Sequence, residues 1–326
     1  MVYINKELSS KFEKNDRTHR HKFPLWERGW EYKYKWLVII GIIFIVSLAW
    51  GPLSDWLTVK SAKPEAIKLV KESGMSHTGE LIFLRARPQL DSDAQLSSDC
   101  PASSANNLGY LEQGCYDPNS SRIYLRNMPD SLHSSEIATA AYEMLHPVYE
   151  SIVSSGDTRL NSIIEAEYKS HSGDSSLKAL VKAFAKTEPG ARDEELFSIF
   201  GVNYSDISTD LYNYYMPYFA DRNLTTAADN QVDELFRSYS SQLKQLKATI
   251  KHDHDLANTA YYDSLSWANV GNQYETNYNY NIYRNDINLE NEAVNQFNQI
   301  LDNYNTLVEQ YNGTQPISPI SNAQPK

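Results

Sequence analysis

The residues with the clearest chemical content lie together in the segment Thr139-Ala-Ala-Tyr-Glu-Met-Leu-His. Glu143 and His146 occupy the second and fifth positions of the pattern H-E-x-x-H. On a helix, that pattern places two histidines one turn apart, where both can bind zinc, while the glutamate activates a metal-bound water. Tyr142 stands at the position of the first histidine. The segment therefore holds the base and one ligand of a zinc hydrolase, with a phenol in place of the other ligand.

The pattern around this segment predicts the helix that would position it. Ser134-Ser135 can cap a helix that begins there, with Glu136 in the first turn. Apolar residues then recur on one face at positions 137, 141, 145 and 148. Pro147 follows His146 directly, and inside a helix it removes a backbone hydrogen bond to the preceding turn. We therefore expect a kink at Glu143, the residue that would serve as the base.

Other patterns predict the elements on either side of this helix. A helix from Pro64 to Glu72, ended by Gly74, precedes a strand at 79–87. A loop, a Gly-Cys-Tyr turn and a second strand follow, at 88–114, 114–116 and 122–126. Later in the chain we expect helices over about 159–170, 175–186, 192–200 and 208–219. In the C-terminal third, apolar residues at helical spacing predict two long antiparallel helices, broken around 267–283.

The order of these pieces resembles a family of membrane-anchored bacterial proteins with a zincin-like extracytoplasmic domain. In that family a Gly-Cys-Tyr and a short strand precede an Ala-Ala-His-Glu-Met-Leu-His helix. An Asn-Glu-Leu-His-Ser-Ile-x-Gly-Thr-Glu block, a Tyr-Tyr-x-x-Tyr-Phe-x-Asp-Arg stretch and a helical hairpin rich in Tyr-Asn follow. This chain has Glu194-Glu-Leu-Phe-Ser-Ile-Phe-Gly-Val-Asn203 and Tyr214-Tyr-Met-Pro-Tyr-Phe-Ala-Asp-Arg222 in the same order. The resemblance covers about residues 80–312 and implies a zincin-like fold.

This chain departs from the family where the chemistry would be. Tyr142 replaces the first histidine, Phe197 replaces the histidine of the second block, and Asn203 stands where that block ends in glutamate. A catalytic zinc site needs three protein ligands and an open position for water. Only His146 and Glu195 keep good ligand chemistry, so we expect no cofactor. Zinc is expected only if Tyr142 or a further residue completes the site, with Glu143 as the base.

A structural interpretation competes with each of these assignments. Tyr142 then fills the volume of the former metal site, and His146 is a hydrogen-bonded core histidine. Glu143 needs a partner if it is buried, which the Tyr142 hydroxyl or an arginine can supply. The same interpretation makes Glu195 a surface acid of its helix, Asp221 and Arg222 a structural ion pair, and His252 and His254 solvated side chains.

The N-terminal part predicts a membrane anchor. Residues 36–54 form an uncharged run of 19 residues between Lys35 and Asp55, long enough to cross a bilayer core. Residues 1–35 carry nine Lys and Arg against five acids, so their net charge is +4. The positive-inside rule then places the N-terminus in the cytoplasm and the larger part outside. A cleaved signal peptide and a buried core helix are the alternatives.

The two cysteines and the overall composition fit this topology. Cys100 and Cys115 both follow the predicted span, so we expect one disulfide in an oxidising compartment. The net charge of −11 argues against a nucleic-acid partner. The predicted fold is α+β and mainly helical, with a single N-terminal transmembrane helix, a small sheet with helices, and a C-terminal hairpin. The expected parts are a cytoplasmic segment 1–35, a transmembrane helix 36–56, a zincin-like domain 57–228, the hairpin 229–312 and a disordered tail 313–326.

Three functions compete on these observations. The first is a membrane-anchored pseudoenzyme that binds a peptide or an envelope protein through its degenerate metallopeptidase-like domain. The second is an active metallohydrolase with an unorthodox ligand set. The third is a structural envelope protein that forms homo-oligomers through its C-terminal helices. The substitutions at Tyr142, Phe197 and Asn203 favour the first.

Overall fold

The computed structural model describes the backbone of residues 25–100, 113–187 and 190–312. The side chains at 25–35, 41, 45–50, 186–187 and 312 lie outside the described part. The predicted tail 313–326 and most of the predicted cytoplasmic segment 1–35 also lie outside it. The chain divides into two compact units, Met1–Leu57 (unit 1) and Thr58–Lys326 (unit 2).

Helix α1 (Leu25–Ser61) forms the described part of unit 1 and contains the apolar run 36–54. The large apolar side chains described between Trp36 and Phe44 are all exposed, by 44% to 63%. Among the residues that the structure describes, no helix combines the length and the apolar character that a membrane crossing requires.

Unit 2 contains a three-stranded sheet with the strand order β1-β3-β2. The central strand β3 (Arg122–Arg126) pairs in parallel with β1 (Gln89–Asp91) and antiparallel with β2 (Gly114–Asp117). The prediction of a strand at 122–126 is confirmed. The prediction of a turn at 114–116 is wrong, because these residues extend along β3, with Gly114 opposite Leu125.

Two further predictions before the site helix are wrong. The expected strand at 79–87 is helix α3 (His77–Arg85), because the Ser76 side chain caps it by accepting the backbone N–H of Gly79. The expected loop at 88–114 contains strand β1 and helix α4 (Asp93–Asp99). A short helix with several apolar residues has a sequence pattern similar to that of a strand, and only the capping residue distinguishes the two.

Most of the remaining helices of unit 2 follow the sequence prediction closely, but the helix expected at 208–219 ends earlier, at Tyr215. Helix α2 (Pro64–Glu72) has the predicted bounds. The predicted Ser134-Ser135 cap is wrong, since the short 3-10 helix η1 (Asp130–Leu132) runs directly into helix α6. The other helices are α6 (His133–Ser154), α7 (Leu160–Ser170), α8 (Ser175–Thr187), α9 (Arg192–Val202) and α10 (Thr209–Tyr215). Together with the sheet they confirm a fold that is α+β and mainly helical.

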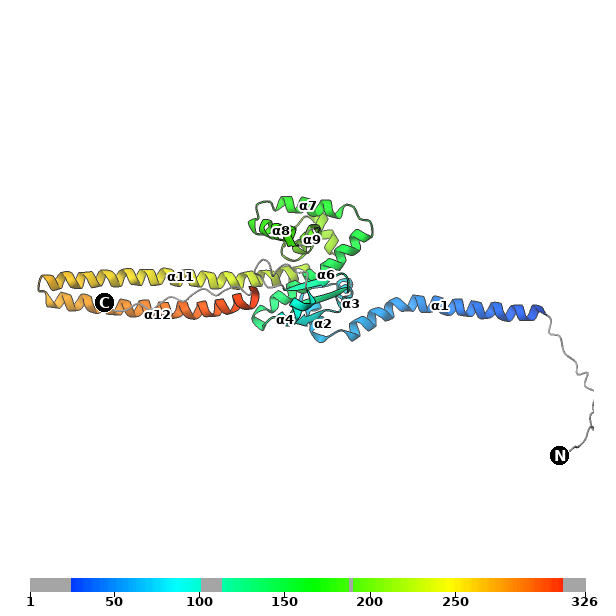
Figure 1. Cartoon of the computed structure of the whole chain (residues 1–326), viewed down its shortest axis with the longest axis horizontal. Helices are drawn as coiled ribbons and strands as arrows, with labels where there is room; N and C mark the ends of the chain where they lie inside the picture. The colour runs from blue at the N-terminus through cyan, green and yellow to red at the C-terminus, as the bar shows by residue number, and fades with distance from the viewer. Residues whose placement is uncertain (1–24, 101–112, 188–189, 313–326) are drawn as a thin grey trace, which may run out of the picture. The chain divides into compact units, whose positions relative to one another are not determined.

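Helix α6 is the centre of the main core. It packs against α9, α11, α2, α3 and the sheet, and Figure 1 shows these elements gathered around it. Ala141, Leu145 and Val148 are fully buried, as the predicted apolar face requires. The helix continues through Pro147 to Ser154. Because α6 is held on so many sides, its polar residues lie among rigid neighbours.

The C-terminal third forms the predicted pair of long antiparallel helices (Figure 1). Helix α11 (Arg222–Asn269) and helix α12 (Gln273–Asn312) pack along their length and are joined by a turn at 270–272. The expected break over 267–283 is therefore only this short turn. Helix α11 begins earlier than the predicted boundary at 229, because the Asp221 side chain caps it.

Arg222 attaches the start of α11 to the end of α9. Its guanidinium is buried and donates to the backbone carbonyls of Phe200, Gly201 and Tyr204. These carbonyls lie at the C-terminal end of α9, where the helix dipole favours a cation. The prediction of an Asp221–Arg222 ion pair is therefore wrong, since Asp221 caps α11 and Arg222 binds carbonyl groups.

A tight contact at Gly74 gives the first testable prediction. Gly74 has φ of +69°, and a Cβ atom there would lie 2.0 Å from the carbonyl oxygen of Asp221. Gly156 also has a positive φ, of +89°, but a Cβ atom there would meet no other atom within 4 Å. Gly156→Ala is therefore expected to cost about 1 kcal/mol of stability, and Gly74→Ala about 3 kcal/mol or more. Equal urea midpoints for the two variants would contradict this prediction.

Candidate functional site

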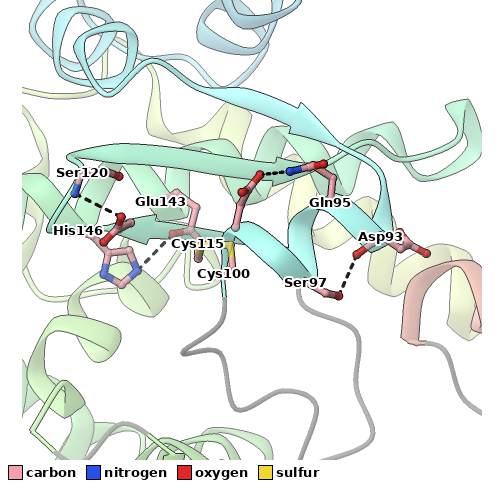
Figure 2. The surroundings of a disulfide bond; sticks show 10 residues. Asp93, Gln95, Ser97, Cys100, Cys115, Ser120, Glu143 and His146 are labelled. Carbon is pink, nitrogen blue, oxygen red and sulfur yellow. Dashed lines mark hydrogen bonds and ion pairs between the residues drawn. A yellow bond between two sulfur atoms is a disulfide. The ribbon is translucent and has the colours of Figure 1, made fainter.

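The predicted disulfide is confirmed and lies beside the site helix. Cys100, at the end of α4, is bonded to Cys115 of β2, with 6.2 Å between their Cα atoms. Figure 2 shows the bond close to Glu143 and His146 of α6. A Cβ atom on Gly114 would lie 3.2 Å from Cγ of Glu143. The strand that carries Cys115 therefore packs directly on the motif residues.

Helices α6 and α9 together assemble a polar cluster around His146. From α6, the Oε2 atom of Glu143 lies 3.8 Å from Nε2 of the imidazole (Figure 2). From α9, Oε1 of Glu194 lies 2.8 Å from Nδ1 and Oε1 of Glu195 lies 3.9 Å from Nε2. Tyr142 donates its hydroxyl to Oε2 of Glu195 at 2.5 Å. We call Tyr142, Glu143, His146, Glu194 and Glu195 the His146 cluster.

The cluster is largely closed off from solvent. Glu143, Glu195 and His146 are between 4% and 8% exposed. The rings of Tyr142 and Tyr116 lie against the imidazole, with centroids 5.5 Å and 6.5 Å from its own. The interpretation of His146 as a hydrogen-bonded core histidine agrees with this geometry. The interpretation of Glu195 as a surface acid is wrong, because the N-terminal turn of α9 faces α6.

The environment of His146 favours its protonated form. Burial alone lowers the pKa of an imidazole, because it penalises the charged form. The hydrogen bond to Glu194 and the charges of Glu143 and Glu195 outweigh this penalty and raise the pKa to about 9. Three carboxyl groups thus surround one imidazolium. A protonated imidazole donates from both nitrogens and offers no lone pair to a metal.

The structure does not bring all the predicted positions into the cluster. Phe197 is fully buried between the rings of Tyr149 and Tyr215. Asn203 is exposed at the C-terminal cap of α9, and its side chain hydrogen-bonds to Asp229. Asn203 follows Glu195 by eight residues, which is about 12 Å of helix rise. Phe197 therefore belongs to the core, and Asn203 lies at the far end of the helix.

Sequence reasoning missed Glu194, which makes the shortest contact with His146 among the three carboxylates. The available signal was the Glu-Glu pair at the start of the second block. Acidic side chains are favoured in the first turn of a helix, where they face the positive end of the dipole. Comparison with the family motif singled out Glu195 alone.

His254 of helix α11 is solvent-exposed, as the sequence predicts. Its Nδ1 nevertheless lies 3.2 Å from Oε1 of Glu290, a contact that the sequence does not reveal. Glu290 is 6% exposed in the contact between α11 and α12. A buried carboxylate needs a partner, and the half-exposed imidazole supplies one.

The comparisons with known proteins leave the resemblance without further support. No family model, no curated protein and no solved structure matches the chain. Within the described ranges, no group of three or more His, Cys, Asp or Glu side chains has an arrangement that could hold a metal ion. The zincin-like relationship therefore stays a prediction drawn from the order of the motifs.

Proposed function

We propose that the chain is a membrane-anchored interaction protein of the cell envelope, whose degenerate metallopeptidase-like domain binds a partner and does not catalyse hydrolysis. The observation that carries this proposal is the ion pairing of His146. Both of its nitrogens face carboxylates, and at neutral pH the imidazole carries two protons. The imidazole of His146, which a catalytic metal would need as a ligand, is thus engaged in ion pairs within the cluster.

The other cluster residues support the same conclusion. In a zinc hydrolase, the motif glutamate acts on a water bound to the metal. Glu143 instead lies near the imidazolium and packs under the backbone of Gly114. Tyr142 can ligate a metal only as a phenolate, and here its hydroxyl donates to Glu195. Each motif residue thus stabilises the contact between α6 and α9.

The proposed anchor rests on residues 36–54 of α1. These residues carry no charge and follow a segment with a net charge of +4. The exposed side chains from Trp36 to Phe44 form an apolar surface whose exposure to water is unfavourable. A bilayer core would cover it, with the N-terminus in the cytoplasm and unit 2 outside.

The proposed partner surfaces lie on unit 2. Among the described strands, β2 is at the edge of the sheet and runs beside the His146 cluster, where an extended peptide can add a strand. The end of the hairpin exposes large apolar side chains, of which Val270 and Tyr274 are 71% and 75% exposed. Aromatic side chains are enriched in protein interfaces. An envelope protein or peptide that binds either surface fits the proposal.

The test is the zinc content of the full-length chain. The protein is purified in detergent without a histidine tag, exposed to excess zinc at neutral pH, dialysed and measured by elemental analysis. We expect much less than one zinc per chain for the natural protein and for a Tyr142→Phe control. Tyr142→His restores the first histidine of the pattern and is expected to increase the retained zinc.

The opposite result identifies the alternative function. About one zinc per chain in the natural protein would mean that the metal displaces the proton from His146. The second candidate, an active metallohydrolase with Glu143 as its base, would then replace our proposal. A Glu143→Gln variant that keeps its zinc but loses hydrolysis of a peptide substrate would establish it.

A further inference from the structure

His133 makes a contact that the proposed function does not use. Its Nε2 atom lies 2.7 Å from Oε2 of Glu72, the last residue of α2. Its Nδ1 atom lies 2.7 Å from Oε2 of Glu136, one turn later on α6. The imidazole therefore bridges two carboxylates that come from different helices.

With both carboxylates ionised, this geometry requires a doubly protonated ring. A neutral imidazole has one N–H group and one lone pair, so it can donate to only one of the two carboxylates. The other carboxylate would then face the lone pair across 2.7 Å, which is repulsive. With both nitrogens protonated, each contact is a charge-assisted hydrogen bond. The bridge between Glu72 and Glu136 exists only while His133 is an imidazolium.

The groups around His133 are few and identifiable. Glu72 and Lys68 face it from α2, and Glu136 faces it from its own helix. Burial and Lys68 lower the pKa of His133, and the two carboxylates outweigh them, so that the pKa is raised above 6.5. Glu136 is further held by the backbone N–H of Met128. The α6 end of the bridge is therefore fixed, whereas Glu72 on α2 is partly exposed.

We propose that His133 is a pH-sensitive clasp that holds α2 against α6 while its imidazole is protonated and releases the end of α2 when the proton is lost. Helix α2 is the first complete helix of unit 2, and it packs on α3 as well as α6. The clasp is closed below the raised pKa of His133, as long as Glu72 and Glu136 are ionised. It opens as the pH rises through the raised pKa of His133.

The test is amide hydrogen exchange of the α2 peptide 64–72 in the full-length protein. Protection factors, which are corrected for the intrinsic pH dependence of exchange, are compared at about pH 6 and about pH 8.5. In the natural protein we expect protection of α2 to fall roughly tenfold at the higher pH, since two charge-assisted hydrogen bonds are lost. Protection of α7 is expected to change little.

Three variants separate the clasp from a general loss of stability. His133→Gln is expected to show weak protection of α2 at both pH values, and Glu72→Gln a smaller fall than the natural protein. His77→Gln removes an exposed histidine that contacts Glu80 on α3, and it is expected to keep the full fall. An unchanged fall in His133→Gln or Glu72→Gln would overturn the proposal, as would pH-independent protection in the natural protein.

A direct titration covers the case in which His133→Gln does not fold. The His133 imidazole is followed by NMR in the natural protein, with His133 identified through the Glu72→Gln variant. A midpoint above 6.5 that falls in Glu72→Gln is the expected result. A midpoint at or below 6.5 in the natural protein overturns the clasp.

Discussion

Replacing His146 with glutamine is expected to lower the free energy of unfolding by about 3–5 kcal/mol. The imidazolium is the cation that Glu143, Glu194 and Glu195 share. Without it, the carboxylates of Glu143 and Glu195, which are 4% and 6% exposed, lose the positive charge that lies 3.8 Å and 3.9 Å from them. Removing the cation from a buried ion pair costs far more than the pair contributes, because the remaining charge stays buried.

The measurement is urea denaturation of the natural protein and of three variants, followed by circular dichroism. His77→Gln is the matched control, because it removes a surface histidine that contacts Glu80, and we expect a change within about 0.5 kcal/mol. Adding Glu195→Gln to His146→Gln removes one of the buried negative charges that lost its cation. The double variant is therefore expected to recover part of the lost free energy of unfolding. A loss below about 1 kcal/mol in His146→Gln would mean that the cluster is more hydrated than its burial indicates.

The helices and the central strand could be predicted because their signals are local. Pro64 opens α2 at the first helical position, and the apolar spacing through Ala141 and Leu145 defines the buried face of α6. The apolar residues of α11 and α12 recur at helical spacing over many turns, which excludes any spacing other than that of a helix. The disulfide followed from there being only Cys100 and Cys115 to pair.

The errors have a common physical cause, which is that a cap or a partner far away in the sequence decides the outcome. The segment at 79–87 has strand-like composition, yet one capping hydroxyl at Ser76 starts a helix there. Arg222 reads as the partner of its neighbour Asp221, but the end of α9 offers it several carbonyls. Nothing in the spacing of His133 reveals that Glu72 lies beside it, because the two are 61 residues apart.

The site was predicted only in part, because some of its contacts also depend on partners far away in the sequence. The motif placed Glu143 and His146 on one helix, and the second block brought Glu195 to them, as the structure shows. Glu194 was missed because its role depends on which face of α9 meets α6, and the sequence alone does not fix that rotation. The expectation that Asn203 lies at a lost ligand position came only from the resemblance to the family, and the structure places this residue at the opposite end of the helix from Glu195.

Unit 2 is expected to lose stability at alkaline pH, with a contribution of about 3 kcal/mol from His146 alone. The pKa of His146 is raised from 6.5 to about 9 in the folded chain, because Glu194, Glu143 and Glu195 outweigh the effect of burial. A raised pKa means that the folded state binds the proton more tightly than the unfolded state. The resulting stability is fully present below about pH 6.5 and is lost as the pH rises to about 9.

The decisive measurement is the urea midpoint as a function of pH in the natural protein and in His146→Gln. The natural protein is expected to lose stability steadily between about pH 6.5 and pH 9, whereas the variant lacks the titrating group and is expected to show a much flatter profile. His133 has a raised pKa as well, so His133→Gln is measured beside them to subtract its share. Parallel profiles for the natural protein and His146→Gln would contradict the prediction. That result would place a neutral imidazole in the cluster, and a neutral imidazole keeps a lone pair with which to bind zinc.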